Sequence, residues 1–190
     1  MCEIPVFYAT TEGQTRRIAE RIAQLMRTRG FDSRAIEISS PEASAMDWSG
    51  VHGAFLGASL HAGKHQASAV AFARAHAREL EACPSTFFSV SLSAASSHAK
   101  ELQAARDIAE GFAKETTWQP HRIACVPGRL AYTQYGFFKR QLMKMIARRE
   151  GASTDTSRDH EYTDWRMVEQ LAREMTDAVR YEARLVPLGA

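Results

Sequence analysis

The sequence has little of what marks disulfide-linked, zinc-binding or membrane-spanning proteins. Its three cysteines, Cys2, Cys83 and Cys125, lie far apart without a Cys-x-x-Cys or His/Cys ligand pattern, which argues against both disulfides and zinc. No apolar run approaches the roughly 18 residues of a membrane span. Met1 leads into a short apolar run that lacks the charged region and cleavage site of a signal peptide. We therefore expect reduced thiols and a cytoplasmic location.

An excess of charge of one sign is also missing. Lys and Arg total 24 against 22 for Asp and Glu, so the balance does not imply a nucleic-acid partner, and we expect none. With 190 residues and 45% hydrophobic content, the chain is long enough for one well-filled core and short for two. The sequence therefore predicts a single domain spanning residues 1–190.

Short apolar runs alternate with helical patterns along the chain. The predicted strands are residues 4–8, 35–38, 54–57, 86–92 and 122–126. Helical spacing of apolar residues predicts helices over residues 18–26, 67–80, 99–114 and 164–184. Gly30 is placed to end the first helix and Asp164 to cap the last. This order predicts an open, doubly wound, mostly parallel α/β sheet with helices on both faces and ligands at the carboxyl ends of its strands.

The loop after the first strand is rich in hydroxyl groups. Thr10, Thr11 and Thr15 stand directly before a helix N-terminus, whose free N–H groups and dipole favour an anion. The loop has one glycine, Gly13, and no Gly-Lys-Ser/Thr triplet, so it is neither a dinucleotide fingerprint nor a P-loop. An ordinary Thr-rich cap could look the same, but its place in the first strand-to-helix turn favours phosphate binding without a cationic side chain.

A basic amphipathic segment lies between the fifth strand and the last helix. Its apolar face comprises Tyr135, Phe138, Leu142, Met145 and Ile146, and its basic face comprises Arg140, Lys144 and Arg148. This spacing predicts an inserted helix over residues 135–149. Two interpretations stay open: a core-packing helix with a solvated face, or a surface element that meets an anionic membrane and gives access to a membrane-dissolved quinone.

Four histidines could suggest metal binding or general-base chemistry. They are His61, His65, His76 and His98. No carboxylate ligand accompanies them, and His61 and His65 flank a glycine-containing loop rather than a helix face. We therefore expect solvated loop histidines and no metal site.

Several motifs together resemble one family. "YATTEGQT" is similar to the FMN-phosphate loop of the flavodoxin-like superfamily. "GASLHAGKH", "PSTFFSVSL", "PGRLAYTQYGFFKRQLMKMIARREG" and "TDTSRDHEYTDW" follow in the order and spacing of the menaquinone-dependent protoporphyrinogen oxidases, flavodoxin-like enzymes of haem biosynthesis. The resemblance runs from Pro5 to about Ala178. The first loop is shared by many flavoproteins, whereas the basic insertion with "TDT" and "YTDW" is much more specific.

The resemblance implies a flavodoxin-like sheet of five parallel strands in the order 2-1-3-4-5. It also implies an FMN-dependent oxidoreductase that converts protoporphyrinogen IX to protoporphyrin IX and passes electrons to menaquinone or ubiquinone, with the chemistry carried by the flavin. The implied phosphate contacts are Thr10, Thr11, Glu12, Gly13, Gln14 and Thr15. The implied ring contacts are a loop of Ala58, Ser59, Leu60 and His61 on one side and Ser91, Leu92 and Ser93 on the other. Tyr132, Arg140 and Lys144 are candidates for substrate or quinone access.

The chain departs from the family pattern in two loops. Residues 93–98 read Ser-Ala-Ala-Ser-Ser-His in place of a strongly basic stretch, and His61 is followed by Ala62 in place of an Arg-Tyr pair. A flavodoxin-type electron carrier, an FMN-dependent quinone reductase and a flavodoxin fold without flavin therefore stay open as alternatives. Carriers tend to present acidic surfaces, so the slight basic excess and the inserted helix count against a carrier. Membrane contact by the insertion would place the protein peripherally on the inner face of the cytoplasmic membrane.

Overall fold

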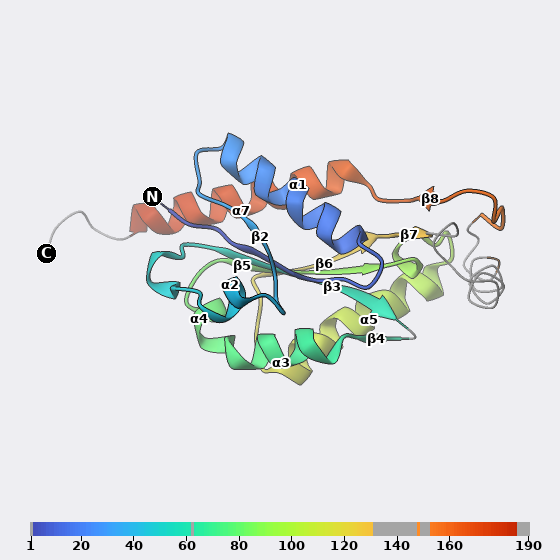
Figure 1. Ribbon diagram of the computed structural model, residues 1–190, viewed down its shortest axis with the longest axis horizontal. Helices are drawn as coiled ribbons and strands as arrows, with labels where there is room; N and C mark the ends of the chain where they lie inside the picture. The colour runs from blue at the N-terminus through green and yellow to red at the C-terminus, as the bar shows by residue number, and fades with distance from the viewer. Residues whose placement is uncertain (1, 62, 131–147, 149–152, 186–190) are drawn as a thin grey trace, which may run out of the picture.

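Parallel strands form the centre of the molecule (Figure 1). The computed structural model describes residues 2–61, 63–130, 148 and 153–185. The parallel strands are β1 (Val6–Ala9), β2 (Ala35–Glu37), β3 (Ala54–His61), β5 (Ser85–Ser91) and β6 (Arg122–Pro127). They lie in the order β2-β1-β3-β5-β6. Because β5 and β6 are the fourth and fifth parallel strands along the chain, the predicted order is confirmed. The short β4 (Lys64–His65) turns back to pair antiparallel with the end of β3.

Helices cover both faces of this sheet, as predicted. The α-helices are α1 (Gln14–Thr28), α2 (Pro41–Ser44), α3 (Ala67–Ala75), α4 (Ala77–Glu81), α5 (Ala99–Thr116) and α7 (Trp165–Leu185). Two short 3₁₀ turns are η1 (Trp48–Gly50) and η2 (Ser93–Ala95). Figure 1 shows α1 and α7 on one side of the sheet and α3, α4 and α5 on the other. Within the part of the chain that the structure describes, no helix has the length and apolar character needed to cross a bilayer.

The core lies in two layers because side chains alternate across a strand. On β1, Val6 and Tyr8 join the apolar cluster under α1 and α7, whereas Phe7 and Ala9 join the cluster under α3 and α5. On β5, Phe88 belongs to the first cluster and its neighbour Phe87 to the second. Burial on both faces explains why these strands read as short apolar runs rather than as an alternating pattern.

The predicted helix ends are confirmed. Gly30 adopts φ 90° after α1, and its N–H donates to Arg27 O while the N–H of Phe31 donates to Met26 O, the paired bonds of a Schellman cap. Asp164 Oδ1 accepts the N–H groups of the next turn at 2.9 and 3.4 Å and so caps α7. The single helix predicted over residues 67–80 is wrong at one position. It is interrupted at His76, whose ring packs at a tilt against Trp48 and Phe72.

A second, two-stranded sheet lies at the carboxyl edge and has no counterpart in the sequence prediction. It consists of β7 (Arg129–Leu130), directly after β6, and β8 (His160–Glu161), which pair antiparallel. We call this pair the stem ribbon. In the sequence it flanks the predicted basic helix at 135–149, which lies outside the described residues except for the exposed, helical Arg148. Tyr132, Arg140 and Lys144 also lie outside them.

Candidate flavin site

A pocket of about 460 Å³ lies at the carboxyl ends of β1, β3, β5 and β6. This is the edge at which doubly wound sheets bind ligands. The predicted flavin contacts that line it are Thr10, Glu12, Gln14, Thr15, Ser59, Leu60, His61, Ser91, Leu92 and Ser93. Gly63, Val90, Glu101, Gly128, Arg129 and Leu130 complete the lining. Residues from segments far apart in the sequence therefore meet where the motifs predicted a cofactor.

The phosphate loop leads into an α1 N-terminus that has no side-chain cap among the described residues. Gly13 precedes α1 with φ 82°, a left-handed conformation that glycine adopts without strain, and its N–H donates to Thr10 Oγ1 at 3.0 Å. No side chain caps α1, and its first turn carries no acidic residue. Thr15 Oγ1 is buried and has no hydrogen-bond partner among the described residues. A free helix N-terminus beside an unpaired buried hydroxyl suits an anion such as a phosphate.

Gln14 contributes its side chain to the architecture of the site. Its Nε2 donates to Thr163 Oγ1 at 2.8 Å and to Glu161 Oε1 at 3.2 Å. Thr163 in turn donates to Pro127 O at 2.9 Å. These bonds tie the start of α1 to the end of β6 and to the stem ribbon. A ligand would thus meet the backbone N–H of Gln14 rather than its side-chain amide.

The second predicted contact segment is not a loop. Residues 58–61 continue β3, because β4 folds back and pairs with Leu60 and His61 while Ala58 and Ser59 still pair with β5. Ser59, Leu60 and His61 line the pocket, but Ala58 is fully buried in the core and does not. The prediction of a loop here is wrong because the hairpin partner is too short to be recognised from its own sequence.

Gln66 joins the phosphate loop to the end of β3. Its Nε2 donates to Ser59 Oγ at 2.5 Å and to Thr11 Oγ1 at 3.3 Å. Thr11, which is exposed, and Gly13 both shape the loop without lining the pocket. The role of Gln66 could not be seen in the sequence, since it depends on Thr11, which is 55 positions away along the chain.

His65 is a packed side chain and not the solvated loop histidine that we predicted. Its Nε2 lies 2.9 Å from Ser89 Oγ, and its ring packs edge-on against Phe87 and Phe112. Burial lowers the pKa of His65 to about 4, so the ring is neutral at physiological pH. His76, which is half-buried against Trp48, also contradicts the prediction. His61 and His98 are exposed.

The sequence reasoning missed Arg129. Its side chain, 17% exposed, lies in the pocket lining. Nη2 donates to Glu12 O at 3.4 Å, and Nη1 lies 3.7 Å from Asp159 Oδ2. Nε is buried and, among the described residues, has no hydrogen-bond partner. The signal that could have found this residue is its place just after a predicted parallel strand, where ligand contacts gather.

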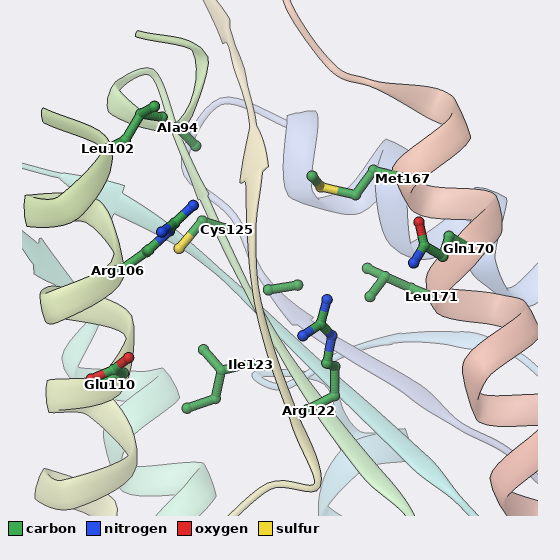
Figure 2. Close-up of a pocket in the computed structure, with 11 residues that line it drawn as sticks. Ala94, Leu102, Arg106, Glu110, Arg122, Ile123, Cys125, Met167, Gln170 and Leu171 are labelled. Atoms are coloured by element: carbon green, nitrogen blue, oxygen red, sulfur yellow. The ribbon is translucent and has the colours of Figure 1, made fainter. Parts of the chain in front are cut away.

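A second hollow, of about 440 Å³, lies along β6 between α5 and α7 (Figure 2). Its labelled lining residues include Arg106 and Glu110 from α5, Ile123 and Cys125 from β6, and Met167, Gln170 and Leu171 from α7. Burial raises the pKa of the Cys125 thiol, which disfavours its reactive thiolate form. None of the predicted flavin contacts lines this groove. The described residues also contain no cluster of His, Cys, Asp or Glu that could hold a metal ion.

Comparison with known proteins identifies the family of this chain. Residues 5–157 match the model of the flavodoxin domain family. Protoporphyrinogen IX dehydrogenase [quinone] from Escherichia coli K12 is 31% identical over 170 residues, which cover 90% of this chain and 92% of the relative. The protein of the same name from Leishmania major is 31% identical over 169 residues, covering 88% and 71%.

Solved structures show the same fold. Oxidised flavodoxin 1 from Bacillus cereus superposes with a TM-score of 0.54 at 17% identity, over 92% of this chain and 97% of that one. A short-chain flavodoxin associated with a PDU bacterial microcompartment has a TM-score of 0.55 at 11% identity, over 94% and 99%. These structural likenesses show the fold, and the match to the flavodoxin domain family indicates a flavin cofactor. The chain belongs to the flavodoxin domain family and, within it, to the protoporphyrinogen IX dehydrogenase family.

Proposed function

We propose that this chain binds FMN in the carboxyl-edge pocket and oxidises protoporphyrinogen IX to protoporphyrin IX, with menaquinone or ubiquinone as the electron acceptor. The observation that carries the proposal is the meeting of unpaired donors at the start of α1 with the ends of three other strands in one pocket. The relatives' names supply the substrate and the acceptor class. When bound, the flavin would supply the redox chemistry that transfers hydrogen from the porphyrinogen to the quinone.

The protein's own part is to hold, orient and tune the cofactor. The proposed phosphate contacts are Thr10, Thr11, Glu12, Gly13, Gln14 and Thr15, with the backbone N–H groups of α1 and the Thr15 hydroxyl as donors. The proposed ring contacts are Ser59, Leu60 and His61 on one side, with Ala58 packed beneath them in the core, and Ser91, Leu92 and Ser93 on the other. A loop that receives a terminal phosphate favours FMN over a dinucleotide flavin. No side-chain acid or base is required for this chemistry.

The basic insertion supports a role at the membrane, where quinones dissolve. We assign access of substrate or quinone to Tyr132, Arg140 and Lys144, and contact with an anionic inner membrane surface to the basic face of residues 135–149. Vesicle flotation tests this assignment: binding to anionic lipid at low salt and release at high salt are expected. Absence of flotation with anionic vesicles at low salt would contradict it.

The first test of the activity is anaerobic. FMN-loaded protein is mixed with protoporphyrinogen IX, with and without a menaquinone analogue, and protoporphyrin fluorescence is followed. Growth that depends on quinone and exceeds the protein-free control is expected. Bound FMN and quinone reduction by nicotinamide without porphyrin formation would instead identify a quinone reductase, which the altered residues at His61 and 93–98 make the strongest alternative.

A further inference from the structure

The described lining of the pocket contains ionisable residues of both signs. Its ionisable lining residues, among those that the structure describes, are Glu12, His61, Glu101 and Arg129. Two of them are carboxylates, which disfavour a nearby dianion. Arg129 is the permanent cation in this described lining, because an arginine keeps its proton at any physiological pH.

The guanidinium of Arg129 is incompletely bonded for a side chain so little exposed. Its contacts are long: 3.4 Å from Nη2 to Glu12 O and 3.7 Å from Nη1 to Asp159 Oδ2. Its buried Nε–H donates to none of the described residues. A buried donor without an acceptor destabilises the folded state, and more so when it is charged. The structure therefore holds a cationic donor that an anionic ligand would satisfy.

The position of the guanidinium indicates which anion it would bind. Glu12, whose carbonyl oxygen it contacts, lies within the phosphate loop. Thr15, at the other end of that loop, has the second unpaired buried polar atom in the same pocket lining. Given the proposed FMN function, on which this step rests, we infer that Arg129 donates to the phosphate of the flavin, opposite the N-terminus of α1. The guanidinium and the helix dipole then both neutralise the phosphate.

This contact would connect the cofactor to the stem ribbon. Arg129 is in β7 and pairs with Glu161 of β8. Glu161 in turn accepts from Arg17 at 3.0 Å and from Gln14 at 3.2 Å. The stem ribbon is thus held to α1 by the bonds of Glu161. The proposed bond from Arg129 to the phosphate would add a further link between them. Binding of FMN should therefore stabilise the stem ribbon, whereas riboflavin, which lacks the phosphate, should not.

The test compares two flavins on the full-length protein. Dissociation constants for FMN and riboflavin are measured by quenching of flavin fluorescence for the wild type, Arg129→Gln, Arg129→Lys and Arg17→Gln. Arg129→Gln should weaken FMN binding about tenfold or more and leave riboflavin binding unchanged. Arg129→Lys should recover part of the loss because it keeps the charge. Arg17→Gln is the matched control: it removes an ion pair to the stem ribbon from a residue outside the pocket lining, and should leave both affinities unchanged.

Hydrogen exchange on the wild type gives a readout that needs no variant. FMN, but not riboflavin, should slow exchange at residues 128–130 and 160–163. Equal losses for both flavins in Arg129→Gln would overturn the inference, since the residue would then only shape the pocket. Unchanged FMN binding in Arg129→Gln with a raised KM for the porphyrinogen would also overturn the inference, because Arg129 would then bind a carboxylate of the substrate. A folded wild-type protein that binds neither flavin would contradict the proposed function itself.

Discussion

The centre of the sheet and its carboxyl edge are built differently. At the centre, Phe87 stacks on Phe112 with ring centroids 4.1 Å apart, and the polar groups of His65 and Ser89 bond each other. At the edge, Thr15 and Arg129 each keep a buried polar atom without a partner among the described residues. The aromatic centre around Phe87 thus has its polar groups paired without a ligand, whereas the edge does not. Stability and cofactor affinity should therefore respond to different substitutions.

The largest effect is expected at the centre, from Gly57→Ala. A Cβ on Gly57 would lie 2.1 Å from Phe88 Cζ, so the ring and its fully buried surroundings would have to move. We expect a loss of about 3 kcal/mol in the free energy of unfolding, measured in urea. Gly111→Ala is the control, because a Cβ there meets nothing within 4 Å inside α5. It should stabilise the protein by about 0.5–1 kcal/mol. Equal effects at the two glycines would contradict this account of the core.

A smaller loss should follow acidification, through His65. Its pKa is about 4 in the folded protein and 6.5 without burial, so the unfolded chain binds the extra proton between these values. The contribution of neutral His65 to the free energy of unfolding is complete above pH 6.5 and is lost as the pH falls toward about 4. We expect the free energy of unfolding to fall by about 2 kcal/mol. This is less than the full pKa shift would give, because the ring is not wholly buried.

The measurement is urea unfolding of the wild type and His65→Gln at about pH 7 and about pH 4.5. Glutamine can still bond Ser89 but does not titrate, so the acid-induced loss should be smaller in the variant. Carboxylates that also titrate in this range affect both proteins alike. An identical pH dependence in the two proteins would show that His65 is not held neutral by its packing.

The smallest effect is expected at the edge, from Thr15→Val. Removal of the hydroxyl should weaken FMN binding about tenfold, or roughly 1.4 kcal/mol, and spare riboflavin. The free energy of unfolding without flavin should not fall, since the lost hydroxyl has no described partner. Thr116→Val is the matched control: its buried hydroxyl donates to Phe112 O at 2.9 Å, so it should lower stability and leave flavin affinity unchanged. Loss of stability without loss of FMN affinity in Thr15→Val would contradict the division between centre and edge.

Several features could be predicted from local patterns alone. The strands and their order follow from short apolar runs alternating with helical spacing and from the motifs that match the family. The ends of α1 and α7 follow from Gly30 and Asp164, whose preferences act within one or two turns. The phosphate loop follows from Thr10, Gly13 and Thr15 because its position after the first strand restricts what it can bind. Each of these signals is carried by residues that are neighbours in the sequence.

Other features depend on contacts that no local pattern encodes. β3 reaches His61 only because the two residues of β4 pair with its end. The prediction of a solvated His65 is wrong because Phe87 and Phe112, from two other elements, pack against its ring. Arg129 lies in the pocket lining because β7 pairs with β8, although 29 residues separate Leu130 from His160 in the sequence. Periodicity and composition establish the layers and the loop, but burial, pairing and unsatisfied donors arise only when distant segments meet.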